Sequence, residues 1–205
     1  MSKLPGSSRA RRRADAERSA AAVLEAAVRV LNQRPTATIG DVADAAGLTR
    51  QTVYAHFPSR QALLRAVIDR ATEEALAEMD AADLERGSSA AALMRLLDAS
   101  WQTFARYPVL LQLPDDAMEE AESHDLHRPI FDRLDRLVRR GQAAGEFDDR
   151  LSPTWLLAAT LALGHAAGGE VGAGRMSAEE ASASLRRSIL RVFGAKEPPS
   201  TTGSG

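Results

Sequence analysis

The stretch Gly47–Phe57, with the sequence GLTRQTVYAHF, carries many hydrogen-bonding side chains for so short a segment. Arginine and glutamine can each make two parallel hydrogen bonds to the edge of a guanine or an adenine base. Threonine, tyrosine and histidine suit phosphate oxygens, which fix the register of a protein on a duplex. The side chains of these kinds are Arg50, Gln51, Thr52, Tyr54 and His56. Their combined chemistry indicates a nucleic acid as the binding partner.

Two short helices are expected to position this stretch. Thr38 can cap the first helix, because Asp41 stands three residues later and closes a capping box. Gly47 follows at a position where a helix end often needs a positive φ. Thr49 can then cap the second helix, and Val53 is its inward-facing residue. Two helices joined by a glycine-containing turn, the second polar on its outer side, form a helix-turn-helix signature.

The charges of the chain are unevenly distributed. Residues 1–65 contain 11 Lys and Arg against 5 Asp and Glu, a net charge of +6. Residues 66–205 hold the other 15 basic and 23 acidic residues, a net charge of −8. This asymmetry predicts a basic N-terminal module for a polyanion on an acidic body. Chance clustering of arginines is the alternative interpretation.

The composition favours an all-α protein, because Ala, Leu and Arg dominate while Val, Ile, Tyr and Phe are sparse. The absence of cysteine excludes disulfides and thiolate metal sites and fits the cytoplasm. The basic N-terminus lacks the apolar stretch of a signal peptide, and the uncharged run Trp155–Gly169 falls short of a membrane span. Apolar spacing, prolines and caps predict helices over residues 14–33, 39–46, 50–56, 59–80, 90–107, 129–144, 153–172 and 177–193.

The segment TIGDVADAAGLTRQTVYAHFPSRQALLRAVID resembles the DNA-binding signature of TetR-family transcriptional regulators. The shared features are a Thr-capped helix, an Ala-Gly turn and a Tyr-x-His-Phe end to the recognition helix, and the resemblance covers roughly residues 14–70. It implies a three-helix DNA-binding domain followed by a larger helical domain for ligand binding and dimerisation. The expected divisions are a disordered basic arm (1–13), the DNA-binding domain (14–58), a connecting helix and linker (59–84), the C-terminal domain (85–195) and a flexible tail (196–205).

The resemblance also implies roles for single residues. Arg50, Gln51 and Thr52 stand where the family reads bases, and Gln51 replaces a common glycine. Tyr54 and His56 stand where the family commonly contacts phosphates. The other residues of the implied DNA contact are Thr38, Thr49 and Arg60, the last in place of the usual lysine. The arginines of the arm are expected either to reach the minor groove or to form part of a solvated tail.

In the C-terminal half, aromatic and polarisable side chains on separate helices predict an apolar pocket for a small-molecule effector. Ordinary core packing is the alternative for each of them. The candidates are Trp101, Phe104, Tyr107, Met118, His127, Phe131 and Trp155. His124 and His127 lie among acidic residues, but a solvated acidic loop is a better interpretation than a metal site. No cofactor is expected.

The resemblance implies a homodimer formed through the helices 153–172 and 177–193, which would present two recognition helices to a palindromic operator. The small residues of the helix 153–172 allow the close approach of helices that such a dimer interface needs. The expected mechanism is repression that is relieved when an effector shifts the helix 59–80. The alternatives are a helical protein-interaction scaffold without operator binding, a DNA-binding protein with a vestigial pocket, and an enzyme, for which no nucleophile elbow or phosphate loop is present.

Overall fold

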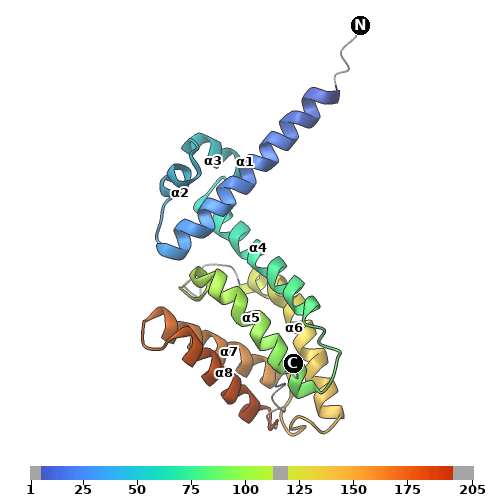
Figure 1. Cartoon of the computed structure of the whole chain (residues 1–205). Helices are drawn as coiled ribbons and strands as arrows, with labels where there is room; N and C mark the ends of the chain where they lie inside the picture. Colours follow the sequence, from blue (N-terminus) through green and yellow to red (C-terminus); the bar gives the residue numbers. More distant parts are fainter. Residues whose placement is uncertain (1–5, 113–119, 196–205) are drawn as a thin grey trace, which may run out of the picture. The chain divides into compact units, whose positions relative to one another are not determined.

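The computed structural model describes residues 6–112 and 120–195, and all regular structure in these two ranges is helical (Figure 1). The all-α fold class predicted from the composition is therefore confirmed. The chain divides into two compact units, Met1–Arg70 and Ala71–Gly205. The division falls inside one helix, α4 (Arg60–Ala81). The five domain divisions expected from the sequence stay a prediction.

The first unit is built from α1 (Gly6–Gln33), α2 (Ile39–Ala46), α3 (Arg50–His56) and the start of α4. α1, α2 and α3 all contact one another. An apolar stripe of α1 is buried, with Val23, Ala26 and Ala27 at 0% exposure. This stripe and the buried faces of α2 and α4 form the core on which the turn between α2 and α3 is held.

The first helix begins earlier than the sequence predicted. The expected start was Ala14, after a disordered arm, but α1 begins at Gly6. Alanine and arginine are good helix formers, and pairs three or four residues apart support the extension. Arg13 donates to Glu17 at 3.0 Å, and Arg18 pairs with Asp15. Residues 6–13 therefore continue the helix, and only residues 1–5 of the expected arm lie outside the described part of the chain.

The second unit contains the C-terminal part of α4, then α5 (Ser89–Arg106), the 3₁₀-helix η1 (Pro108–Gln112), α6 (Glu120–Ala143), α7 (Pro153–Gly172) and α8 (Ala178–Val192). α7 packs against α8 and α6, and α5 packs against α6 and α8. Their shared core includes Leu93, Val138, Leu156, Ile189 and Phe193, all fully buried. The capping box that Ser177 and Glu180 predict at the start of α8 is present, and Ser152 caps α7 directly before Pro153. Among the described helices, none combines the length and apolar character needed to cross a lipid bilayer.

Helix α6 also begins earlier than expected. The sequence placed its start at Pro129, because proline removes a helical hydrogen bond and is favoured in a first turn. The helix instead starts at Glu120 and carries Pro129 in its interior. Acidic residues near its N-terminus favour this start, since that end of a helix is partially positive. The Arg133 Nη1 donates to the Pro129 carbonyl oxygen at 3.0 Å on the C-terminal side of the proline.

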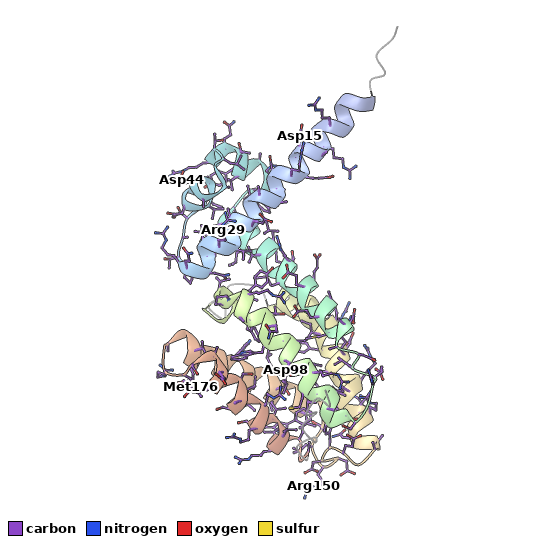
Figure 2. All side chains as sticks on the ribbon, viewed as in Figure 1. Asp15, Arg29, Asp44, Asp98, Arg150 and Met176 are labelled. Atoms are coloured by element: carbon purple, nitrogen blue, oxygen red, sulfur yellow. The ribbon has the colours of Figure 1, made fainter. Side chains whose placement is uncertain are left out.

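The turn between α6 and α7 holds a carboxylate whose acidity can be measured. Both Asp148 oxygens accept hydrogen bonds from the Arg150 guanidinium, with Nε–Oδ1 at 2.8 Å and Nη2–Oδ2 at 2.6 Å (Arg150 is labelled in Figure 2). The Arg150 backbone N–H also donates to Oδ1 at 3.0 Å. These bonds, the side-chain ones first, lower the pKa of Asp148 from 3.8 to about 2.

We therefore expect the Asp148 carboxyl carbon to titrate at a pH of about 2 in an NMR titration of the intact chain. Because the folded pKa is depressed, the stabilising effect of this pair is complete above the ordinary pKa of 3.8 and is lost as the pH falls towards 2. In Arg150→Ala the pKa should rise towards its ordinary value, with only the backbone bond still lowering it. A wild-type Asp148 that titrates near 4, the ordinary value of a carboxyl group, would contradict this reading.

Candidate nucleic-acid interface

The turn between α2 and α3 is fixed by local hydrogen bonds at both of its ends. Thr38 is the N-cap of α2, and its hydroxyl and amide form the predicted capping box with Asp41. Gly47 adopts φ 67° and ψ 30° at the end of α2. The Gly47 N–H donates to the Asp44 carbonyl oxygen at 3.2 Å, and the Leu48 N–H donates to that of Ala43 at 3.0 Å. This pair of bonds is the Schellman arrangement, and it confirms the predicted left-handed glycine.

Helix α3 begins at a second threonine cap. The Thr49 hydroxyl accepts the Thr52 N–H at 3.1 Å, and the two threonine hydroxyls lie 2.9 Å apart within hydrogen-bond distance. The capping bond satisfies one of the free N–H groups that every helix start leaves. Each hydroxyl has two lone pairs as well as a donor, so this pairing leaves capacity for a further bond.

The residues of α3 separate into an inner and an outer side, as the spacing predicted. Val53 is 0% exposed and Ala43 of the neighbouring helix α2 is 1% exposed, so both belong to the core. Arg50, Gln51 and Tyr54 are exposed, whereas Thr52 and His56 are half-buried at the flanks. Tyr54 is 51% exposed, which is high for a large aromatic side chain. α3 therefore gathers five of the eight predicted DNA-contacting residues on one short helix.

Ion pairs and hydrogen bonds hold α2 to its neighbours. The Asp41 Oδ1 accepts from the Arg34 Nη2 at 2.6 Å, and its Oδ2 accepts from the Thr38 N–H at 2.7 Å. The hydrogen bonds from the Thr38 hydroxyl and amide, followed by the charge of Arg34, lower the pKa of Asp41. Arg29 of α1 donates to the Ala45 carbonyl oxygen at 3.5 Å, which links α1 to the far end of α2 (Figure 2 labels Arg29 and Asp44).

Arg60, at the start of α4, makes contacts that its position in the sequence did not indicate. Its Nε donates to the Ala37 carbonyl oxygen at 3.1 Å, and its Nη2 donates to the Pro35 carbonyl oxygen. These bonds tie the start of α4 to the loop that leads into Thr38. Arg60 thus positions the loop before the helix-turn-helix.

Two residues near the predicted interface were missed by the sequence interpretation. Arg34 forms the ion pair with Asp41, and Gly40 lies directly beneath the Arg50 guanidinium. Both contacts join residues that are seven or more positions apart: Arg34 lies in the loop before α2, and Arg50 lies on α3. Only the folded chain brings them together, so no spacing rule could have found them.

The predicted effector residues fall into different environments in the second unit. Tyr107 is 3% exposed at the end of α5, while Trp101, Phe104 and Phe131 are half-buried. Trp155 lies instead at the surface of α7, with 60% of its area exposed. Met118 lies outside the described residues, and His127 belongs to α6 with a side chain outside the description. Among the residues that are described, no His, Asp and Glu side chains cluster as a metal site would require.

The geometry in the first unit defines a class of protein: a helix-turn-helix protein with an exposed, polar second helix. Residues 23–67 match the family model described as "Bacterial regulatory proteins, tetR family". The chain is 30% identical to the HTH-type transcriptional regulator TtgR of Pseudomonas putida over 159 residues, which are 67% of this chain and 74% of that protein. The chain therefore belongs to the TetR family of transcriptional regulators, which are DNA-binding proteins and not enzymes.

A second relative gives a closer match over a shorter stretch. The HTH-type transcriptional repressor LfrR of Mycolicibacterium smegmatis is 41% identical over 83 residues, or 40% of this chain and 44% of that repressor. The crystal structure of LfrR from Mycobacterium smegmatis in complex with proflavine aligns with a TM-score of 0.65 and 25% identity. That alignment covers 85% of this chain and 96% of the LfrR chain, so the likeness in fold extends through both units.

Proposed function

We propose that this chain is a repressor that binds a palindromic operator as a homodimer and releases it when a small molecule binds the second unit. The observation that carries the DNA-binding part is the outer side of α3. Arg50, Gln51 and Tyr54 are exposed there while Val53 fixes the helix in the core. A helix with this polarity fits the major groove, where an arginine or a glutamine can identify a base pair. The name of the relative LfrR as a repressor supports the direction of regulation.

For DNA contacts, we propose that Arg50, Gln51 and Thr52 face the bases. Thr38, Thr49, Tyr54 and His56 then contact phosphates, where a hydroxyl, a phenol or an imidazole can donate to an oxygen. Arg60 supports this surface chiefly through its bonds to the loop at residues 35–37. The net charge of +6 over residues 1–65 favours the approach of this unit to DNA. Such a protein would act in the cytoplasm.

We propose α7 and α8 as the dimer interface. α7 exposes two large apolar side chains, Trp155 at 60% and Leu161 at 40%. Small residues lie between and beyond them, so a second helix could approach closely; those exposed are Ala158, Ala162, Ala166 and Gly169. Exposed apolar surface on a helix is typical of a protein interface. A twofold dimer formed there would present two copies of α3 to the two halves of an operator.

The effector is proposed to be a small, largely apolar molecule that binds among the aromatic residues of the second unit. Tyr107, Trp101 and Phe104 on α5 are the first candidates, followed by Phe131, Met118 and His127. Trp155 is assigned to the dimer interface in preference to the pocket, because of its exposure. Proflavine is a reasonable first compound to test, since LfrR is described in complex with it.

The effector can release DNA only if its affinity differs between the DNA-binding and the released state of the protein. We propose that α4, which runs through both units, links effector binding to DNA release.

The proposal is tested by selecting duplexes from a random-sequence pool with the full-length chain and measuring the affinity of the selected duplex at several salt concentrations. Two chains are expected to bind each duplex, and the selected sequence should be palindromic. The logarithm of the binding constant should fall linearly with that of the salt concentration, by about 0.9 for each phosphate neutralised. Proflavine added to the complex should release the duplex. The selection of no sequence, or binding that is insensitive to salt, would instead favour a helical interaction scaffold.

A further inference from the structure

Gly40 lies in the first turn of α2, directly under the guanidinium of Arg50 from α3. A Cβ atom at Gly40 would lie 2.6 Å from the Arg50 Nη2 and 2.8 Å from both its Cζ and its Nε. Carbon and nitrogen atoms in contact normally stand about 3.5 Å apart or more. The three similar distances mean that such a Cβ would meet the body of the guanidinium and not one protruding tip. Only a residue without a side chain allows Arg50 to rest where it does.

The burial of the two residues agrees with this contact. Gly40 is buried although it lies only two residues after the exposed cap Thr38, whereas Arg50 is exposed. Within the described part of the chain, the Arg50 side chain makes no hydrogen bond or ion pair, and so its contact with the backbone of α2 is steric. All the N–H donors of the guanidinium therefore remain available to a ligand.

Glycine is otherwise a poor choice for this position. It lowers helix stability by roughly 0.5–1 kcal/mol relative to alanine, because it loses more backbone freedom on folding. Its φ at this position is not in the left-handed region, so no backbone requirement explains it. The space that it leaves for the guanidinium is the feature that a larger residue would remove.

We propose that Gly40 is a positioning residue for Arg50: it forms a backbone seat that holds the guanidinium in one orientation before DNA binds. A free arginine side chain has many rotamers, and ordering it at an interface opposes binding. A guanidinium that already rests on α2 loses less freedom when it meets a base edge, and its direction is set by α2 as well as by α3. The inference rests on the proposed DNA contact of Arg50, and it adds a residue of α2 to the determinants of sequence preference.

The seat can be removed with little effect on the fold. In Gly40→Ala the clashing atoms are the end of a flexible, exposed side chain, so Arg50 can move aside while the helices stay in place. The added methyl group also favours the helix. We expect the thermal midpoint of Gly40→Ala to equal or exceed that of the wild type, which would separate a displaced guanidinium from a damaged domain.

The test is a double-mutant cycle on a duplex that the wild-type chain has selected from a random-sequence pool. Gly40→Ala should weaken binding by about tenfold, within the range of one bidentate base contact, and should relax the preference at the base pair that Arg50→Ala also relaxes. In the Arg50→Ala background, Gly40→Ala should change the affinity by less than about twofold, because no guanidinium is left to displace. Arg50→Lys, which keeps the charge but lacks the fork, should also be nearly insensitive to Gly40→Ala.

Three results would overturn the inference. Wild-type affinity and preference in Gly40→Ala would show that the seat is irrelevant. An equal loss in both backgrounds would show that Gly40 acts through the shape of α2 and not through Arg50. Failure of the wild-type chain to select any duplex would remove the proposed function and this inference with it. A measurement without DNA completes the set: the Arg50 Nε–H should be more ordered by ¹⁵N relaxation in the wild type than in Gly40→Ala, and equal mobility would contradict the seat.

Discussion

Arg50→Ala is expected to weaken binding of the selected duplex by about a hundredfold or more in the folded dimer that we propose. One bidentate arginine–guanine contact contributes about 1–3 kcal/mol to discrimination, and a twofold dimer loses the contact in both half-sites. Since Arg50 would contact a base, the loss should be concentrated at one base pair per half-site. The slope of affinity against salt concentration should change little, whereas loss of a phosphate contact would reduce it by about one for each site.

The matched control is Arg136→Ala, which removes the same side chain from an exposed position on α6 in the second unit. Its affinity should equal that of the wild type. Tyr54→Phe, which removes only a phenolic O–H, should weaken binding by a smaller factor and uniformly across sequences, as expected for a phosphate contact. Unchanged affinity in both Arg50→Ala and Tyr54→Phe would show that α3 is not the recognition helix.

Gly141→Ala is expected to lower the stability of the second unit by about 2–3 kcal/mol, the upper part of the range for overpacked cores. A Cβ at Gly141 would clash with Cδ2 and Cε2 of the Phe147 ring. That ring cannot move aside easily, because it is 4% exposed and packs edge-on against Phe193 with 5.1 Å between ring centroids. The turn is also closed by the Glu146 N–H, which donates to the Gly141 carbonyl oxygen at 2.8 Å.

The measurement is thermal or urea unfolding followed by tryptophan fluorescence. Both tryptophans of the chain, Trp101 and Trp155, lie in the second unit, so the signal reports on that unit. The midpoint temperature should fall by roughly 5–10 °C for a change of this size. Gly172→Ala is the matched control, since a Cβ there meets nothing within 4 Å and should be neutral or slightly stabilising. Equal stability of the two variants would show that the Phe147 ring gives way.

The two substitutions of glycine by alanine differ for a physical reason. At Gly40 the obstructing group is the free end of an exposed arginine, so the structure should adapt and the binding should change. At Gly141 the obstructing group is an aromatic ring enclosed in the core, so the stability should change. The sequence gives no sign of either difference, because both residues are glycines in helices with ordinary backbone angles.

Features that depend on a few neighbouring residues were predictable from the sequence. The capping boxes at Thr38 and Ser177, the cap at Thr49 and the left-handed Gly47 are all present. Each requires only a side chain and a backbone group within four positions, so its energy is set locally. The inward direction of Val53 followed from helical periodicity for the same reason.

The sequence was less informative where local preferences compete. Residues 6–13 were expected to be disordered, and Pro129 was expected to start its helix, yet α1 and α6 both extend further. In α6, the acidic residues at the helix start outweigh the unfavourable Pro129, whereas in α1 the helix-forming alanine and arginine residues extend the helix. The sequence predicted the same pocket role for all of the aromatic candidates. Only the fold separates the buried Tyr107 from the exposed Trp155, because burial depends on which helices pack over each side chain.

The sequence by itself determined that this chain is all-helical with a helix-turn-helix near its N-terminus, because periodicity, caps and the glycine turn act over a few residues. Its role as a regulator followed from its resemblance to the TetR family. The tertiary structure alone decided that Arg60 ties the loop before α2, that Arg50 rests on Gly40, and that Phe147 lies over Gly141. These contacts join separate elements, and their distances depend on how whole helices pack. The side chains of α3 were thus apparent from the sequence, whereas the seat that holds Arg50 became visible only in the fold.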